Sequence, residues 1–207
     1  MAVIGGVDEV VTSVRDAAAG SGRTVVGIAG APGAGKSTLA ARLVERLGAE
    51  AALLPMDGFH LPQRRLVDLG RRDRMGAPDT FDVPGFLHVL RRVRANDGAV
   101  PAPGFDRTVE EPVPDAIRIG PEHTVVVVEG NYLLLDSGGW EGAAGLLDVT
   151  FYVEVPRDVR LRRLIDRHVA FGKSPEAAEA WALGPDERNA ELIAGTASRA
   201  RHRVVLT

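Results

Sequence analysis

The sequence predicts an α/β fold in which a mostly parallel sheet is covered by helices on both faces. Three observations support this prediction. Short apolar, β-branched runs alternate with segments whose apolar residues recur at helical spacing. The run at 124–128 is too apolar for a strand with one face in water. A glycine-rich turn joins the run at 24–29 directly to a helical segment, which is typical of the crossover units that build parallel sheets.

Five apolar runs are predicted to be strands, and the longer periodic segments to be helices. The strands are expected at 24–29, 51–56, 124–128, 149–155 and 204–206. The helices are expected at 5–18, 36–47, 83–95, 156–170 and 185–199, with a shorter one at 63–69. Four prolines among alternating apolar residues predict an irregular hairpin at 101–119, on the edge of the domain.

Local signals mark several of these elements. Apolar residues recur at steps of three and four in 5–18 and in 36–47, and Gly48 ends the second of these helices. Pro156 lies in the first turn of its helix, where the missing amide has no intrahelical partner to lose. The stretch 58–82 is rich in Arg, Gly and Asp and has weak periodicity, so only one short helix is expected there.

The composition is that of a globular protein and excludes several classes of function. Of the 207 residues, 45% are hydrophobic and 26% charged, so we expect a single domain, 1–207, with a sizeable core. The absence of cysteine excludes a disulfide scaffold, a thiolate zinc site and a cysteine nucleophile. The net charge of -3 argues against a nucleic-acid partner.

The sequence also predicts that the protein does not contact a membrane. No apolar run approaches the roughly 18 residues that span a bilayer. The first residues include Asp8 and Glu9 and lack the basic start that is typical of a signal peptide. We therefore expect a cytoplasmic protein.

The strongest functional motif is the segment 30–37, Gly-Ala-Pro-Gly-Ala-Gly-Lys-Ser, which matches the P-loop pattern at every fixed position. Its glycines allow the backbone N–H groups, together with the positive end of the next helix, to face phosphate oxygens. Lys36 is expected to contact the β- and γ-phosphates of ATP, and Ser37 to bind Mg²⁺. The residues expected to bind the nucleotide are Gly30, Ala31, Pro32, Gly33, Ala34, Gly35, Lys36, Ser37 and Thr38.

Asp57 is the candidate for contact with a phosphate acceptor. It follows the strand at 51–56, and open parallel sheets bind ligands at the carboxyl ends of their strands. A carboxylate there can accept the proton of an attacking hydroxyl and orient it toward the γ-phosphorus. The alternative is a turn aspartate that bonds its own backbone. His60 is either a substrate contact or an ordinary loop residue.

Glu129 ends the most apolar run of the chain. Because that run is expected to be central in the sheet, Glu129 should emerge level with the P-loop, beside the substrate. There it can hold Mg²⁺ through the metal's waters or orient Ser37 as a metal ligand. The alternative is a glutamate that ends its strand in solvent.

Two further clusters are candidates for an acceptor pocket. Asp79 is expected to contact the substrate, whereas Asp82 is equally well explained as the N-cap of the helix at 83–95. Phe105 and Asp106, in the sequence Phe-Asp-Arg of the predicted hairpin, are suited to lining the pocket. An ordinary turn is the alternative for this second cluster.

A series of arginines at steps of three and four residues lies on one face of the helix at 156–170. Its members are Arg157, Arg160, Arg163 and Arg167. One interpretation is a solvated basic face. The other is a lid, at about 157–185, that folds over ATP so that Arg163 and Arg167 meet phosphate charge.

In this order, the motifs resemble those of the P-loop kinases grouped with phosphoribulokinase, uridine kinase and type I pantothenate kinase. The resemblance extends from about Thr24 to the end of the chain. It implies a five-stranded parallel sheet between helices and suggests a homodimer. It also implies that Asp57 is the catalytic aspartate of the acceptor side, that Glu129 begins the acidic second motif, and that Arg163 and Arg167 are lid arginines.

Within this group the sequence shares features with more than one member. The segment 76–82 looks closest to pantothenate kinase, whereas the compact length and the segment 103–106 look more like uridine kinase. Gly76 stands where a uridine kinase has an acidic residue that holds the sugar, and Phe105 replaces a tyrosine. The chain is also similar to small bacterial proteins described as fructose-transport-system kinases or nucleoside kinase-like proteins.

The sequence therefore predicts a kinase that uses ATP and Mg²⁺ to phosphorylate a hydroxyl of a small nucleoside-, pantothenate- or sugar-like metabolite. An acceptor-binding insert is expected at about 58–119. The alternative is a regulatory nucleotide switch that has no small-molecule acceptor. Neither the Asn-Lys-x-Asp guanine signature nor the Leu-Ser-Gly-Gly-Gln transporter signature occurs in the chain. Their absence argues against the nucleotide switch.

Overall fold

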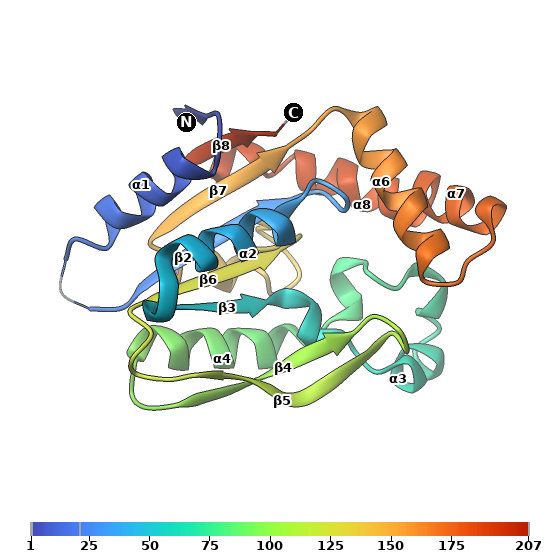
Figure 1. Cartoon of the computed structure of the whole chain (residues 1–207). Helices are drawn as coiled ribbons and strands as arrows, with labels where there is room; N and C mark the ends of the chain where they lie inside the picture. Colours follow the sequence, from blue (N-terminus) through green and yellow to red (C-terminus); the bar gives the residue numbers. More distant parts are fainter. Residues whose placement is uncertain (1, 21, 207) are drawn as a thin grey trace.

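The structure is a computed structural model that describes residues 2–20 and 22–206, and its centre is a six-stranded parallel sheet with helices on both faces (Figure 1). The strand order is β1-β8-β7-β2-β6-β3. The strands are β1 (Ala2–Ile4), β2 (Thr24–Gly30), β3 (Ala51–Pro55), β6 (Val125–Gly130), β7 (Val149–Glu154) and β8 (His202–Val205). The prediction of an α/β fold with a parallel sheet is confirmed.

The sheet has six strands, and the five-stranded sheet implied by the family resemblance is therefore a wrong expectation. The additional strand, β1, pairs in parallel with β8, with Val3 opposite Arg203. It has three residues, of which two are exposed. A strand this short has neither the length nor the apolar pattern from which a strand can be predicted.

The helices agree with the predicted segments to within two residues at each end, except near the C-terminus. The helices of the described residues are α1 (Val7–Ala17), α2 (Lys36–Leu47), α3 (Gln63–Asp68), α4 (Val83–Ala95), α5 (Glu141–Ala144), α6 (Arg157–Ala170), α7 (Pro175–Leu183) and α8 (Pro185–Ala194). The last of them ends before Gly195, a poor helix former, and a separate 3-10 helix follows at Ala197–Arg199. None of these helices is long and apolar enough to cross a membrane.

Helix α7 was not predicted, because most of its surface faces solvent. Only Ala178 and Ala182 are buried, so the segment lacks an apolar stripe. Its start does carry a recognisable signal. The side chain of Ser174 accepts a hydrogen bond from the Ala177 amide at 3.2 Å, and Pro175 occupies the first position of the helix.

Alternate residues of the central strands contribute to two separate cores. On β6, Val127 packs into the core that contains Leu43 of α2, whereas Val128 packs into the core that contains Phe86 of α4. Figure 1 shows α1 and α2 on one side of the sheet and α4 on the other. Because both faces of the central strands are covered, their polar side chains are confined to the strand ends, which is where Glu129 lies.

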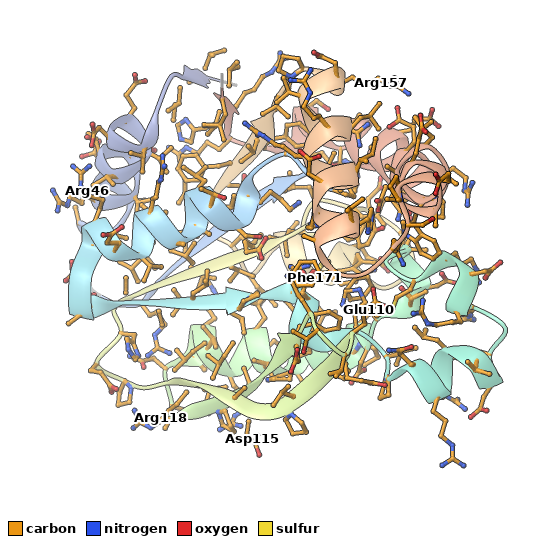
Figure 2. All side chains as sticks on the ribbon, turned by 45° about the vertical axis from the view of Figure 1, so that its right-hand side comes forward. Arg46, Glu110, Asp115, Arg118, Arg157 and Phe171 are labelled. Carbon is orange, nitrogen blue, oxygen red and sulfur yellow. The ribbon has the colours of Figure 1, made fainter. Side chains whose placement is uncertain are left out.

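The predicted irregular hairpin is confirmed as β4 (Val100–Asp106) and β5 (Glu111–Ile119), with a shift in register between Ala102 and Gly104. Figure 2 shows Arg118 and Asp115 on the outer part of the hairpin and Glu110 at its turn, near the body of the molecule. The hairpin packs directly on the loop after β3. A Cβ atom at Gly58 would lie 2.1 Å from the Pro103 carbonyl oxygen.

We expect the substitution Gly58→Ala to destabilise the protein, because a Cβ atom at this position collides with backbone rather than with a flexible side chain. Overpacking of this kind costs about 2 kcal/mol, which lowers the Tm of a chain of this size by roughly 4–8 °C. Thermal unfolding followed by circular dichroism measures the change. Gly145→Ala, where no atom lies within 4 Å of the added Cβ, is the matched control. Equal melting temperatures for the two variants would show that the hairpin does not rest on Gly58.

Candidate active site

The loop between β2 and α2 has the conformation that its glycines predict. Gly30, Gly33 and Gly35 have φ angles of 153°, 78° and 95°, which side chains disfavour. A Cβ atom at Gly33 would lie 2.8 Å from the Arg160 carbonyl oxygen, so the loop is also closely packed from behind. The first backbone hydrogen bond into α2 among the described residues joins the Leu39 amide to Gly35 O at 3.0 Å. The Ala34 amide donates to the Ala31 carbonyl at 3.1 Å, whereas the amides of the first turn of α2, which have no intrahelical acceptor, are available to an anion at the positive end of the helix.

Lys36 begins α2 and is buried, with 7% of the residue exposed. Its Nζ donates a hydrogen bond to the Ala31 carbonyl at 3.0 Å, which folds the side chain back over the loop. Burial lowers the pKa of Lys36 to about 8, although the nearby Glu129 and Asp57 carboxylates favour its charged form. A phosphate in the loop would favour the protonated amine further.

Glu129 and Ser37 are brought together by the register of the sheet. Strand β6 pairs with β2, and Glu129 lies opposite Ile28, two residues before the loop begins. The Ser37 hydroxyl donates a hydrogen bond to Glu129 Oε1 at 3.1 Å. Burial and the neighbouring Asp57 charge raise the pKa of Glu129. A hydroxyl and a carboxylate oxygen side by side are the kinds of ligand that Mg²⁺ prefers, so the residues present fit this ion.

Asp57 lies in the short 3-10 helix Met56–Phe59 that follows β3. Its Oδ2 accepts a hydrogen bond from Arg107 Nη2 at 2.5 Å. Burial alone would raise the pKa of this carboxyl, but the charges of His60, Arg107 and Lys36 outweigh it and hold the pKa below its usual range. Asp57 is therefore an ionised carboxylate inside the protein.

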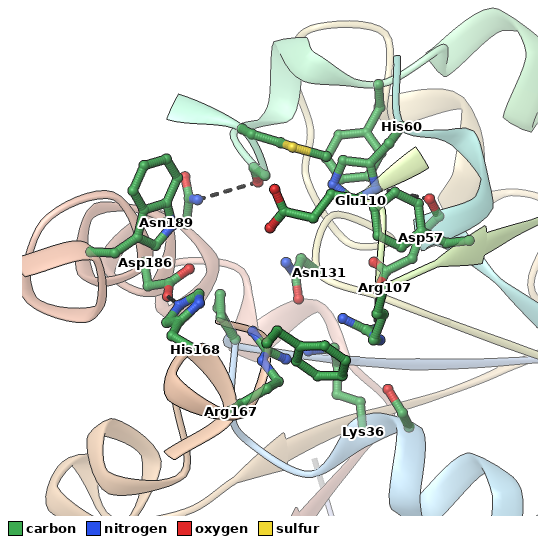
Figure 3. A pocket seen from close by; sticks show the side chains of 18 of the residues that line it. Lys36, Asp57, His60, Arg107, Glu110, Asn131, Arg167, His168, Asp186 and Asn189 are labelled. Atoms are coloured by element: carbon green, nitrogen blue, oxygen red, sulfur yellow. Dashed lines mark hydrogen bonds and ion pairs between the residues drawn. The ribbon is translucent and has the colours of Figure 1, made fainter. Parts of the chain in front are cut away.

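These groups surround one cavity of about 140 Å³. Lys36, Ser37, Asp57 and Glu129 all line it, and Figure 3 shows Lys36 and Asp57 on opposite sides of the same space. The cavity lies at the carboxyl ends of β2, β3 and β6, as expected for an open parallel sheet. The arrangement can hold an anion and a divalent cation on one side and a hydroxyl group on the other.

His60 and Phe105, for which the sequence suggested a substrate contact or an acceptor pocket, also line the cavity. The His60 ring lies between Phe81 and Phe105, with ring centroids 4.0 and 4.8 Å apart. Its Nδ1 is 2.8 Å from the Asp57 carbonyl oxygen. Burial lowers the pKa of His60. The imidazole therefore forms part of the wall next to Asp57.

Two residues that were expected to contact the substrate lie outside the cavity. The Asp79 carboxylate pairs with Arg74 at 2.5 Å and with Arg71 at 3.4 Å. Asp106 accepts hydrogen bonds from the Thr108 amide at 2.8 Å and from its hydroxyl at 2.6 Å, which is the turn named above as the alternative. Asp82 caps α4 by accepting a hydrogen bond from the Gly85 amide at 3.0 Å.

The arginine series of α6 divides into two groups. Arg157 and Arg160, in the first turn, both bind Glu187 of α8, and Arg160 is buried. The interpretation as a uniformly solvated face is therefore wrong. Arg167 lines the cavity, whereas Arg163 is exposed. A Cβ atom built on Gly35 would lie 3.6 Å from Arg163 Nη1, so this side chain adjoins the outer edge of the loop.

Several cavity residues were not identified from the sequence. On the lid side, His168 of α6 binds Asp186 of α8, with Nε2 and Oδ2 2.7 Å apart. Asn131 also lines the cavity, and it could have been found because it comes two residues after Glu129. Glu110 lies at the hairpin turn with a positive φ of 53°. Nothing in the local sequence distinguishes His168 and Asp186 from surface residues.

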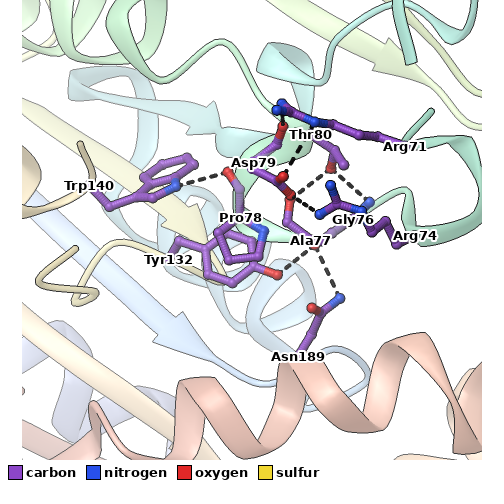
Figure 4. A network of polar contacts seen from close by, with 10 residues as sticks. All are labelled: Arg71, Arg74, Gly76, Ala77, Pro78, Asp79, Thr80, Tyr132, Trp140 and Asn189. Atoms are coloured by element: carbon purple, nitrogen blue, oxygen red, sulfur yellow. Dashed lines mark hydrogen bonds and ion pairs between the residues drawn. The ribbon is translucent and has the colours of Figure 1, made fainter. Parts of the chain in front are cut away.

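Gly76 connects the acceptor-side loop to the rest of the site (Figure 4). Its carbonyl accepts hydrogen bonds from the Tyr132 hydroxyl at 2.5 Å and from Asn189 Nδ2 at 3.2 Å. The nearby Pro78 carbonyl accepts one from Trp140 Nε1 at 3.1 Å. The backbone here is thus held by side chains that follow β6 and by α8, and Gly76 contributes a carbonyl where a carboxylate was expected in a uridine kinase.

Comparison with known proteins places these motifs in one family. The phosphoribulokinase / uridine kinase family model matches residues 25–182. A Schizosaccharomyces pombe protein named "Putative uridine kinase C227.14" is 36% identical over 177 residues, which are 81% of this chain and 74% of that protein. A pantothenate kinase of Brevibacillus brevis is 28% identical over 83% of this chain and 59% of that enzyme.

A solved structure extends this likeness to the fold. The crystal structure of a "putative fructose transport system kinase" from Silicibacter sp. TM1040 matches with a TM-score of 0.88 and 36% identity, over 96% of this chain and 98% of that one. The chain therefore belongs to the phosphoribulokinase / uridine kinase family of P-loop kinases.

Proposed function

We propose that this protein transfers the γ-phosphate of ATP to a hydroxyl group of a small polar metabolite. The observation that carries the proposal is that Asp57 lines the same cavity as Lys36, Ser37 and Glu129, with Lys36 and Asp57 on opposite sides of it (Figure 3). A carboxylate on the far side of a phosphate site has a role in a reaction with an alcohol. A nucleotide switch that has no small-molecule acceptor would leave Asp57 without a role.

On the nucleotide side, each residue has a separate task. The glycine-loop amides and Lys36 bind the phosphates, because the loop lies at the positive end of α2 and Lys36 lines the cavity beside it. Ser37 and Glu129 would hold Mg²⁺, which when bound offsets the charge of the phosphate oxygens. Arg167, from α6, adds a second cation at the cavity wall. Arg163, at the outer edge of the loop, would neutralise charge once the lid formed by residues 157–185 closes.

On the acceptor side, Asp57 orients the hydroxyl and takes its proton. Phosphoryl transfer depends on positioning and charge more than on a strong base, so an ionised carboxylate of low pKa is sufficient. The acceptor insert, residues 58–119, supplies His60, Phe105 and Glu110 to the wall around this hydroxyl.

The acceptor belongs to the broad class of polar, hydroxyl-bearing metabolites. The relatives' names refer to uridine, pantothenate and fructose transport, so family membership alone does not choose among nucleoside-, pantothenate- and sugar-like compounds. The cavity wall offers hydrogen-bond acceptors from Glu110, Asn131 and Asp186, which suit a substrate with several hydroxyl groups.

We expect Asp57→Asn to keep nucleotide affinity and to lose most turnover, because the amide cannot accept the hydroxyl proton. A decrease in kcat of about 10²- to 10⁴-fold is typical for the loss of such a group. A coupled assay of ADP release, run with and without a metabolite library, measures it. Asp68→Asn, an exposed carboxylate of the same insert, is the control. Near-wild-type turnover of Asp57→Asn would exclude Asp57 as the acceptor-side residue.

We also expect affinity for Mg-ATP to decrease as the pH rises above 8. The pKa of Lys36 in the nucleotide-free protein is about 8, so the charged amine that binds phosphate is lost through this range. Affinity should decrease by up to about tenfold for each pH unit well above the pKa, because binding then takes up one proton. Isothermal titration calorimetry between pH 7 and about 9.5 tests this.

The matched control for this pH dependence is Lys36→Arg, because a guanidinium stays charged throughout the range. Its affinity is expected to be lower than that of the wild type and independent of pH. A wild-type affinity that is constant from pH 7 to about 9.5 would show that Lys36 does not make the phosphate contact.

A further inference from the structure

Arg107 reaches the cavity from the turn of the β4–β5 hairpin, far in the sequence from every P-loop residue. Its Nη2 donates to Asp57 Oδ2 at 2.5 Å, and its side chain is 40% exposed. A guanidinium carries five N–H donors in a rigid plane. The contact with Asp57 uses one of them, so the others can bind a second anion in the same cavity.

Three of the lysine and arginine side chains that line this cavity reach it from three separate elements. Lys36 comes from the P-loop, Arg167 from α6 and Arg107 from the hairpin, and Figure 3 shows the ends of these side chains facing the same space. Burial and then the positive charge of Arg107 lower the pKa of Arg167. The Asp186, Asp57 and Glu129 carboxylates offset part of this repulsion, and a phosphate group among the three cations would offset more of it.

The other arginine of the acceptor insert that lines the cavity has two described partners. Arg72 donates from Nε to Gln63 Oε1 at 3.0 Å and pairs through Nη2 with Glu110 at 2.7 Å. Arg107, whose described contact is with Asp57 alone, therefore has more donors left than Arg72 for an incoming phosphate.

The hairpin turn does not need Arg107 to stay in place. Gln63 Nε2 donates to the Val109 carbonyl at 2.7 Å, the Arg72–Glu110 pair attaches the next residue, and the Pro103 carbonyl packs on Gly58. These contacts anchor the turn from both sides. A purely structural role for the Arg107–Asp57 pair would be redundant.

We propose that Arg107 is a catalytic residue that contacts the transferred phosphoryl group while it holds Asp57, an assignment that rests on the kinase function proposed above. In the step, the acceptor hydroxyl oxygen forms a bond to the γ-phosphorus and its proton passes to Asp57. The bond from the γ-phosphorus to the bridging oxygen breaks, and its electron pair stays on ADP. Arg107 balances the charge of the transferred oxygens. Charge neutralisation on the acceptor side is thus supplied by the same hairpin that forms the acceptor wall.

The test compares the affinities of the full chain for two nucleotides, each with Mg²⁺: the non-hydrolysable analogue AMP-PNP, which has a γ-phosphate group, and ADP, which lacks one. Arg107→Gln is expected to weaken AMP-PNP binding about tenfold or more and to leave ADP binding within about twofold. Arg107→Lys should recover part of the lost affinity, because lysine keeps the positive charge but lacks the planar set of guanidinium donors. Calorimetry measures both affinities, and thermal unfolding checks that the variants are folded.

The matched control is Arg118→Gln, on the same hairpin. Arg118 is 65% exposed, pairs with Glu122 and points away from the cavity (Figure 2), so both affinities should stay at the wild-type values. If Arg107→Gln weakened AMP-PNP and ADP equally, or neither of them, the assignment would be overturned. If Arg107→Gln did not fold, the same comparison with Arg107→Lys would decide, because this variant keeps a cation beside Asp57.

Failure of the kinase proposal would look different. A wild-type protein that binds AMP-PNP through Arg107 but phosphorylates no acceptor would keep Arg107 as a γ-phosphate contact and would remove the phosphoryl-transfer step. A wild-type protein that binds neither nucleotide would overturn both proposals. A selective loss of kcat in Arg107→Gln, with an unchanged KM for the acceptor, would support the role in the step itself.

Discussion

The constraint on which this structure depends is the mutual compensation of charges buried at the ends of adjacent parallel strands. Lys36 and Glu129 are almost wholly out of water and Asp57 is half-buried, and each charge alone would be costly there. The register of β2, β6 and β3 puts them around one space, where opposite charges offset burial. The two cores cover both faces of these strands, so that polar side chains can lie only at the strand ends.

A site residue could be predicted from the sequence where the signal for it lies in the neighbouring residues, and could not where it depends on contacts between distant elements. The P-loop, Asp57 and Glu129 are recognisable because each lies within a few residues of a strong apolar run or a glycine turn. The pairing of His168 with Asp186 depends on how α6 and α8 meet, which no local pattern encodes. Asp79 lies outside the cavity, and its carboxylate pairs with two arginines that are close to it in the sequence, Arg71 and Arg74.

The attachment of α6 shows how one helix divides its charges between stability and the site. Arg157 and Arg160 bind Glu187 of α8 at the start of the helix. Arg167, about two and a half turns later, lines the cavity. His168, next to Arg167, also pairs with Asp186 of α8 at 2.7 Å, so both ends of α6 are attached to α8 and the position of Arg167 depends on that of α8.

The N-terminal strand has a consequence for engineering the protein. β1 pairs with β8, and directly after β8 the Leu206 amide donates to the Glu154 carbonyl at 3.0 Å. The Leu206 side chain would lie 3.4 Å from a Cβ atom at Gly35. The first few residues thus brace the last strand, which in turn abuts the phosphate loop. A purification tag or a truncation at the amino end would therefore act on ATP affinity, although more than 30 residues separate this end from Lys36.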